Sequence, residues 1–294
     1  MTTLLINRNA KIKASTGEKR PVTVGSVLTY IGLLFWAFVS IFPVYWMLTF
    51  SLKNNAEIYG ENVIGLPRYW LFSNYENAMR VGNISRYFIN STLVAGSTII
   101  IVLIAAFMAT YAMTRLVWKG RKMMNKFFML GLTIPIHASV VPIYIILARL
   151  QWLDTYGAII IPYSAFSLSM GILICNGFMS DIPYDLDEAA FLDGCGVWGI
   201  FFRVITPLMM PAVATVGIYT FLQCWNELMF ANVFIKSPEI RTLPVGIQAL
   251  CGQYTTEWGP IGAALSIATI PTLLVYVFLS KRIQDSFIAG AVKG

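Results

Sequence analysis

Long stretches without a charged side chain recur along the sequence and dominate its pattern of apolar and polar positions. Each of these windows holds at least 22 residues, whereas a helix needs about 20 to cross the hydrocarbon layer of a bilayer. Lipid offers no hydrogen bonds to a backbone, so the windows predict helices. The expected fold is all-α, with six transmembrane helices in one domain, residues 24–280. The windows are residues 21–52, 87–114, 127–148, 155–180, 204–226 and 258–280.

Composition agrees with lipid as the solvent. The chain is 57% apolar and 12% charged, whereas soluble domains carry about 25% charged residues. The net charge of +7 comes without a basic stripe interleaved with aromatic residues, so nucleic-acid binding is not expected. No cysteine lies in a CxxC pair or at metal-ligand spacing from a histidine, and we expect free thiols and no metal site.

The loops differ in their content of lysine and arginine, which predicts their orientation. With the N-terminus inside, the inner segments hold 14 of the 21 basic residues and the outer loops hold 7. Basic residues favour the cytoplasmic side. We therefore expect a multi-pass protein with both termini in the cytoplasm, namely an N-terminal arm at 1–23 and a tail at 281–294, while the loops 53–86 and 227–257 face outward.

The inner loop at 181–207 is acidic instead of basic. Its first part predicts a short helix, with Pro183 suited to a first helical position and Gly194 to the left-handed residue after the last turn. Ala189 and Ala190 would form a face that a partner can approach closely. An interfacial helix lying on lipid headgroups is the alternative. Repulsion between its carboxylates and an anionic leaflet favours a protein partner instead.

This loop carries a resemblance. Residues 182–194, which include Glu188, Ala189 and Ala190, together with residues 201–208, resemble the EAA loop of ABC importer permeases. More narrowly, the chain resembles the shorter partner subunit of the maltose-type carbohydrate uptake family, which usually has Ile and Leu where this chain has Val204 and Thr206. The likeness extends to Leu150–Gly157, Trp225–Glu227, Thr242–Gly246 and Ala289–Gly294.

The resemblance implies a type I importer permease in a bacterial cytoplasmic membrane. Its expected partners are a second permease subunit, two ATPase subunits, an extracytoplasmic sugar-binding protein and membrane lipid. Nothing in the sequence matches the phosphate-binding pattern GxxxxGK[ST], so ATP and magnesium belong to the partner ATPases, and no enzyme activity or bound cofactor is expected of this chain. By the same resemblance, the residues that engage the ATPase are Asp187, Glu188, Ala189, Ala190, Asp193 and Gly194. The tail at 281–294 would approach the ATPase dimer interface.

The end of the fifth window offers candidate sugar contacts. Aromatic faces and amide side chains suit a hydroxylated ring, but packing between helices is an alternative role for the same residues. The acidic residue at this end is expected to lie at the interface or to line a path. The candidates are Gln223, Trp225, Asn226 and Glu227.

Two other features have competing interpretations. His137, the only histidine, could act in a proton relay, but a neutral side chain bonded to carbonyls freed near Pro135 and Pro142 is the preferred interpretation. The outer loop at 53–86 could dock the binding protein or form an aromatic belt at the membrane interface. Its aromatic residues include Tyr69, Trp70, Phe72 and Tyr75.

Two rival classes fit the pattern less well. An ion-coupled secondary transporter needs buried charges, and the six windows contain none apart from His137, which can titrate. An intramembrane enzyme needs a Ser/His/Asp set, an HExxH motif or paired carboxylates within the membrane, which are absent from the windows. The sequence does not decide between neutral oligosaccharides and uronate oligosaccharides such as alginate fragments as cargo.

Overall fold

The computed structural model describes residues 24–60, 62–252 and 256–291, with side chains described as far as Phe278 in the last helix. Every regular element in these ranges is a helix. The elements are α1 Val24–Phe50, α2 Asn55–Tyr59, α3 Ser73–Arg80, α4 Ile84–Thr114, α5 Arg121–Leu130, η1 Gly131–Thr133, η2 His137–Ser139, α6 Val140–Arg149, α7 Gly157–Ser180, α8 Asp185–Leu192, α9 Val197–Ile200, η3 Phe201–Ile205, α10 Thr206–Leu208, α11 Met210–Trp225, α12 Met229–Phe234, η4 Pro238–Ile240, α13 Leu243–Ala249 and α14 Trp258–Ala291.

The chain divides into two units, Met1–Trp46 and Met47–Gly294. In the first unit the described residues belong to α1, which has no charged side chain and exposes its large apolar residues. This is the composition expected of a helix whose surroundings are lipid. The predicted N-terminal arm at 1–23 lies outside the described residues.

Four of the six predicted windows are continuous helices that are long and apolar enough to cross a membrane. They are α1, α4, α7 and the part of α14 from Trp258 to Phe278. The predicted boundary at residue 280 is not a break, because α14 continues as a helix to Ala291. The expected role of the tail at 281–294 rests on side chains outside the described part of the chain.

The third window is not the single straight helix that the sequence predicts. Two apolar legs, Arg121–Thr133 and His137–Arg149, meet at an angle of 92°. Ile134 adopts an extended conformation with ψ 119°, as expected of a residue that precedes a proline, and Pro135 has no N–H to continue the helix. The window is therefore one broken span or a re-entrant segment.

The fifth window is also bent, near Pro207 and Pro211. The legs Val197–Leu208 and Met210–Trp225 meet at 73°, and the first leg contains a π-helical turn at Phe201–Ile205. Pro207 and Pro211 each lie in the first turn of a new helix, α10 and α11, where the missing N–H does little harm. With each bent pair counted as one span, the described chain has six.

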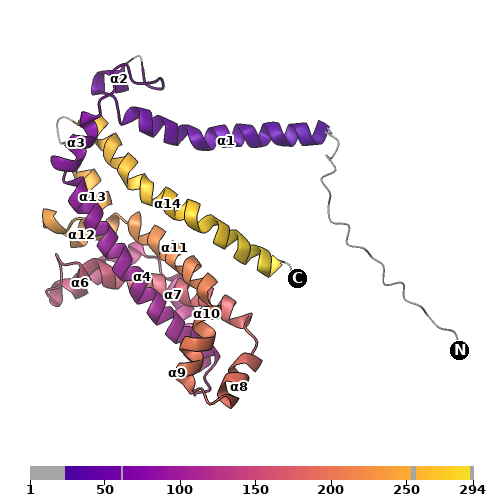
Figure 1. Ribbon diagram of the computed structural model, residues 1–294. Coiled ribbons are helices and arrows are strands. Elements are labelled where there is room, and N and C mark those ends of the chain that lie inside the picture. Colours follow the sequence, from indigo (N-terminus) through magenta and orange to yellow (C-terminus); the bar gives the residue numbers. More distant parts are fainter. Residues whose placement is uncertain (1–23, 61, 253–255, 292–294) are drawn as a thin grey trace. The chain divides into compact units, whose positions relative to one another are not determined.

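Helix α4 is the central element of the second unit. Its 31 residues span about 46 Å and contribute to all three apolar clusters. Ile84 and Tyr87 pack with α11, α13 and α14, Val94 and Ala95 with α6, α7 and α12, and Val102 onward with α7, α9 and α11. In Figure 1, α3 lies at one end of α4 and α8 and α9 at the other. The two ends of the unit are thus joined through one long helix.

Close backbone approach allows α13 to pack against α4. A Cβ atom on Gly246 would lie 2.0 Å from Cδ2 of the Tyr87 ring, far inside van der Waals contact. Both residues are buried, and Tyr87 lies in the cluster that joins α4 to α13 and α14. Only glycine at position 246 leaves space for this ring.

We expect Gly246→Ala to destabilise the chain by about 1–3 kcal/mol, because the added methyl group forces Tyr87 or α13 to move. Thermal unfolding of the purified chain in detergent measures the effect. Gly217→Ala is the matched control, since its Cβ would meet nothing within 4 Å. Equal melting temperatures for the two variants would contradict the prediction.

Asp154 ties the loop between α6 and α7 to the segment that follows α12. Its φ of 62° is in the left-handed region, and its backbone N–H donates to the Phe234 carbonyl at 2.9 Å. Its carboxylate accepts from the hydroxyl of Ser237 and from the backbone N–H groups of Ser237 and Lys236. These hydrogen bonds, led by the one from the Ser237 hydroxyl, lower the pKa of Asp154.

Because the folded-state pKa of Asp154 is depressed, its carboxylate contributes stability above the unfolded-state pKa of about 3.9 and loses it as the pH falls through the folded-state value. Asp154→Asn, which tolerates the left-handed conformation, should be less stable than the wild type near neutral pH, with a difference that shrinks toward about pH 3. Melting temperatures measured across this range test the prediction. Parallel pH profiles for the two proteins would refute it.

Candidate functional site

The acidic loop folds into the short helix that its sequence predicts. α8 begins at Asp185, two residues after Pro183, and ends at Leu192. Gly194 has φ +83°. Its N–H donates to the Phe191 carbonyl at 3.0 Å, and the next N–H, of Cys195, donates to the Ala190 carbonyl at 2.9 Å. This pair of bonds is a Schellman motif, so the glycine at 194 is explained by local backbone geometry.

The residues of α8 divide between an inner and an outer face. Ala190 is buried in the apolar cluster with α4, α7 and α9. The prediction that Ala189 and Ala190 together face a partner is therefore wrong for Ala190. Asp187 is also turned inward, where it forms an ion pair with Arg115. Glu188, Ala189 and Asp193 remain exposed. The helix thus packs on its own chain with one side and presents the other.

Sequence reasoning missed two residues of this region. Leu192 is 86% exposed and lies one turn after Glu188 on the outer face, an apolar residue with no cover from its own chain. Its spacing from Glu188 could have identified it. Arg115, which follows α4, was counted only as an orienting charge, because its partner Asp187 is 72 residues away.

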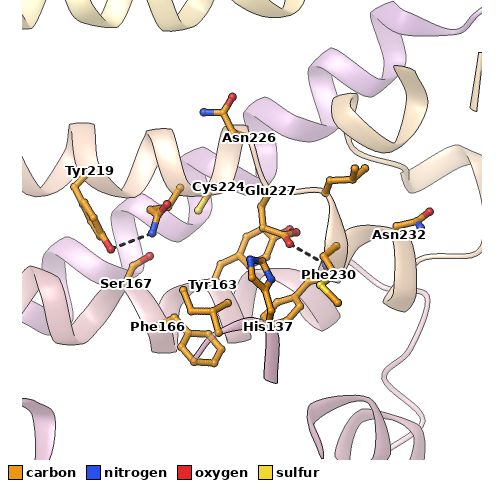
Figure 2. Close-up of a pocket in the computed structure, with 14 residues that line it drawn as sticks. His137, Tyr163, Phe166, Ser167, Tyr219, Cys224, Asn226, Glu227, Phe230 and Asn232 are labelled. Atoms are coloured by element: carbon orange, nitrogen blue, oxygen red, sulfur yellow. Dashed lines mark hydrogen bonds between the residues drawn. The ribbon is translucent and has the colours of Figure 1, made fainter. Parts of the chain in front are cut away.

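The second site is a cavity of about 560 Å³ between the bend of the third window and the last turns of α11 (Figure 2). Its wall comes from the turn before α6, from one face of α7, from the last turns of α11 and from the segment through α12. This volume is within the usual range for small-ligand sites. The wall mixes aromatic, amide and hydroxyl groups. It consists of Ile136, His137, Tyr163, Phe166, Ser167, Tyr219, Gln223, Cys224, Asn226, Glu227, Leu228, Met229, Phe230 and Asn232.

Glu227 has a defined structural role in this wall. Its carboxylate accepts a hydrogen bond from the Tyr163 hydroxyl and from the backbone N–H groups of Phe230, at 2.9 Å, and Ala231, at 3.4 Å. The last two donors belong to the first turn of α12, whose free N–H groups need acceptors. Glu227 therefore caps α12 and links it to α7, instead of extending to the membrane interface.

The other three candidates at the end of α11 differ in where their side chains lie. Gln223 and Asn226 line the cavity, and the Gln223 amide donates to the Tyr219 hydroxyl at 3.0 Å. Trp225 is 4% exposed and packs against Phe88 and Phe221, with its indole N–H donating to the Ala268 carbonyl at 2.9 Å. Successive residues of a helix point about 100° apart, which places Trp225 on the packing side. A sugar-stacking role for Trp225 is therefore not supported.

His137 lies in the cavity wall, below Glu227 in Figure 2. It is exposed, and the expected hydrogen bond to a freed backbone carbonyl is not among the contacts of the described residues. The bend at Pro135 directs this side chain toward the space between the two broken spans. The described residues contain no group of three His, Cys, Asp or Glu side chains that could hold a metal ion.

The outer loop at 53–86 is held by buried polar contacts. Lys53 is fully buried and donates to the carbonyls of Asn62, at 2.7 Å, and Val63, at 3.2 Å. Burial lowers the pKa of Lys53. A hydrogen bond from the Arg68 backbone N–H lowers the pKa of the Glu57 carboxyl. Tyr69, Trp70 and Phe72 are exposed, whereas Tyr75 is partly buried and bonded to Ser51.

Comparison with known proteins decides the family. Residues 101–288, more than half of the chain, match the family described as binding-protein-dependent transport system inner membrane component. The chain belongs to this family. The permease is 31% identical over 282 residues to the diacetylchitobiose uptake system permease protein of Streptomyces coelicolor, covering 95% of this chain and 92% of that one. It is 33% identical over 270 residues to the sulfoquinovosyl glycerol transport system permease protein of Agrobacterium fabrum, covering 92% and 95%.

The fold of the permease is also found in a solved structure. A chain in the crystal structure of a bacterial ABC transporter involved in the import of the acidic polysaccharide alginate superimposes with a TM-score of 0.79 at 20% identity, covering 90% of this chain and 98% of that one. The all-α importer-permease fold expected from the EAA loop is confirmed. The permease is a multi-pass inner-membrane protein and a transport subunit.

Proposed function

We propose that this permease is a subunit of an ATP-driven, binding-protein-dependent importer of oligosaccharides or glycosides. It forms the translocation path with a second permease and receives the energy of ATP hydrolysis through α8. The observation that carries the proposal is α8 itself, an acidic helix with one side packed on its own chain and the other side exposed. Both termini lie in the cytoplasm in this arrangement, as the distribution of lysine and arginine predicts.

The outer face of α8 suits a protein cleft. Glu188 offers a carboxylate to a basic partner, Ala189 allows close approach, and Leu192 offers an apolar contact that water would otherwise cover. Asp193 and Gly194 end the helix beside this face. Asp187 and Ala190 act from the inner side by holding the helix in place. ATP and magnesium are bound by the ATPase subunits.

The cavity supports the transport part of the proposal. Broken helices are tolerated in a membrane where they line a cavity, and such breaks commonly form substrate sites in transporters. The wall offers aromatic faces such as Phe166, amides such as Gln223 and the imidazole of His137, which together suit a hydroxylated ring. The relatives' names include a neutral chito-disaccharide and an anionic sulfosugar glycoside, so a sugar is proposed without a fixed charge.

Replacement of Glu188 by Ala, or of Leu192 by Ser, should weaken retention of the ATPase subunits by about tenfold, because each change removes an exposed contact from α8. The measurements are the amount of ATPase that copurifies with the permease pair, ATP hydrolysis stimulated by the binding protein, and sugar uptake into proteoliposomes. Asp181→Ala is the control, since it removes an exposed carboxylate from the same loop outside α8. Full retention and uptake in both α8 variants would exclude α8 as the docking element.

Gln223→Ala and His137→Ala should lower sugar uptake about threefold to tenfold, the effect of one lost hydrogen bond, while ATPase retention stays unchanged. Initial uptake rates in the reconstituted importer, at several concentrations of the sugar-loaded binding protein, measure this effect. Thr92→Ala is the control, because Thr92 is an exposed position on α4 that lies outside the cavity wall. Unchanged uptake in both cavity variants would remove the cavity from the path.

A further inference from the structure

Arg115 is a buried arginine at the point where α4, α7 and α8 meet. It follows the last residue of α4, and its side chain is 3% exposed. One terminal nitrogen, Nη1, donates to Oδ2 of Asp187 on α8 at 2.7 Å. The other, Nη2, donates to the carbonyls of Met179, at 2.9 Å, and Ile182, at 2.6 Å, where α7 ends. The guanidinium group, carried at the end of α4, therefore contacts the end of α7 and the side of α8.

Tyr184, the N-cap of α8, also contacts the end of α4. The Arg115 guanidinium lies 4.2 Å from the ring centroid of Tyr184, the residue just before α8. The Tyr184 hydroxyl in turn donates to the Thr114 carbonyl at 3.2 Å, the last residue of α4. The polar side-chain contacts made by α8 and its N-cap thus converge on two consecutive residues, Thr114 and Arg115. These contacts connect α8 and its N-cap directly to the end of α4.

The arrangement is poorly explained by stability alone. Removing an arginine and a carboxylate from water has a large desolvation cost, and replacement of such a pair by apolar residues is often neutral or stabilising. The pair is also incompletely satisfied, since Nε of Arg115 and Oδ1 of Asp187 are buried without a hydrogen-bond partner among the described residues. Arginine has a planar fork of donors whose direction is fixed, which a lysine lacks. The geometry defines the position of α8 relative to α4 and α7.

We propose that Arg115 is a positioning residue that transmits the movement of α8 to the transmembrane helices, through Asp187 and the end of α7. This inference rests on the proposed function, in which the ATPase acts on α8. Glu188 and Leu192 hold the partner through exposed side chains, whereas the Arg115 side chain is 3% exposed and bonded to α8 and the end of α7. Docking and transmission are therefore carried by different side chains of α8, exposed ones for docking and the ion-paired Asp187 for transmission.

The test uses the complete importer, with its second permease, ATPase subunits and binding protein, reconstituted in proteoliposomes. Arg115→Gln and Asp187→Asn should leave the amount of copurified ATPase unchanged and retain ATP hydrolysis, while the sugar transported per ATP hydrolysed falls roughly tenfold. The double variant should lose no more than the worse single variant, because both changes break the same contact. If Arg115→Gln fails to assemble, Arg115→Lys replaces it, since lysine keeps the charge without the fork.

Lys119→Gln is the matched control, an exposed residue that loses the same charge from the same inner loop. It should keep the wild-type ratio of sugar to ATP. A wild-type ratio in the Arg115 and Asp187 variants, or a loss of uptake that only follows the amount of assembled complex, would overturn the inference. A different result would contradict the proposed function itself, namely that the Glu188 and Leu192 variants retain both the ATPase subunits and full sugar uptake.

Discussion

The structure depends on one constraint, that a backbone within a membrane must find its hydrogen bonds inside the protein. Two of the six apolar windows violate regular helix geometry, at Pro135 and between Pro207 and Pro211. Such breaks are tolerated where the irregular backbone is buried or lines a cavity. Both broken spans contribute to the wall of the same cavity, through His137 from one and Gln223 from the other. The break at Pro135 thus lies beside the cavity, whereas the fifth span reaches the cavity with the last turns of α11, away from its own bend.

The long helix α4 links this cavity to the exposed acidic helix. Val94 and Ala95 pack in the cluster that surrounds the cavity elements, while Arg115 at the far end contacts α8. Between these two points the helix is packed against α7, α9 and α11 in a continuous apolar cluster. Small residues permit this close packing: Gly171 of α7 faces Ala106 and Val102 of α4 with no room for a larger side chain without adjustment. The two sites can thus be coupled without a flexible connection between them.

Four of the six windows, the short acidic helix and its terminating glycine could be predicted because each depends on local rules. A run of 20 or more uncharged residues defines a span by length, and Gly194 at the end of α8 reflects a backbone conformation that other residues avoid. The sharp bend near Pro207 and Pro211 was predictable for the same reason. Pro135 is itself a local sign of a helix break. The window of 127–148 was defined by the absence of charge, which does not report whether a helix is continuous.

The sequence by itself determined the solvent, the family and the presence of a short acidic helix, because charge spacing and the EAA loop are properties of the linear chain. Only the tertiary structure decided what individual side chains do. Trp225 packs between helices, and Glu227 caps α12. Asp187 forms an ion pair with Arg115, which lies 72 positions away in the sequence. Such roles depend on which helices become neighbours, and that follows from the packing of whole helix faces and not from the spacing of residues within one segment.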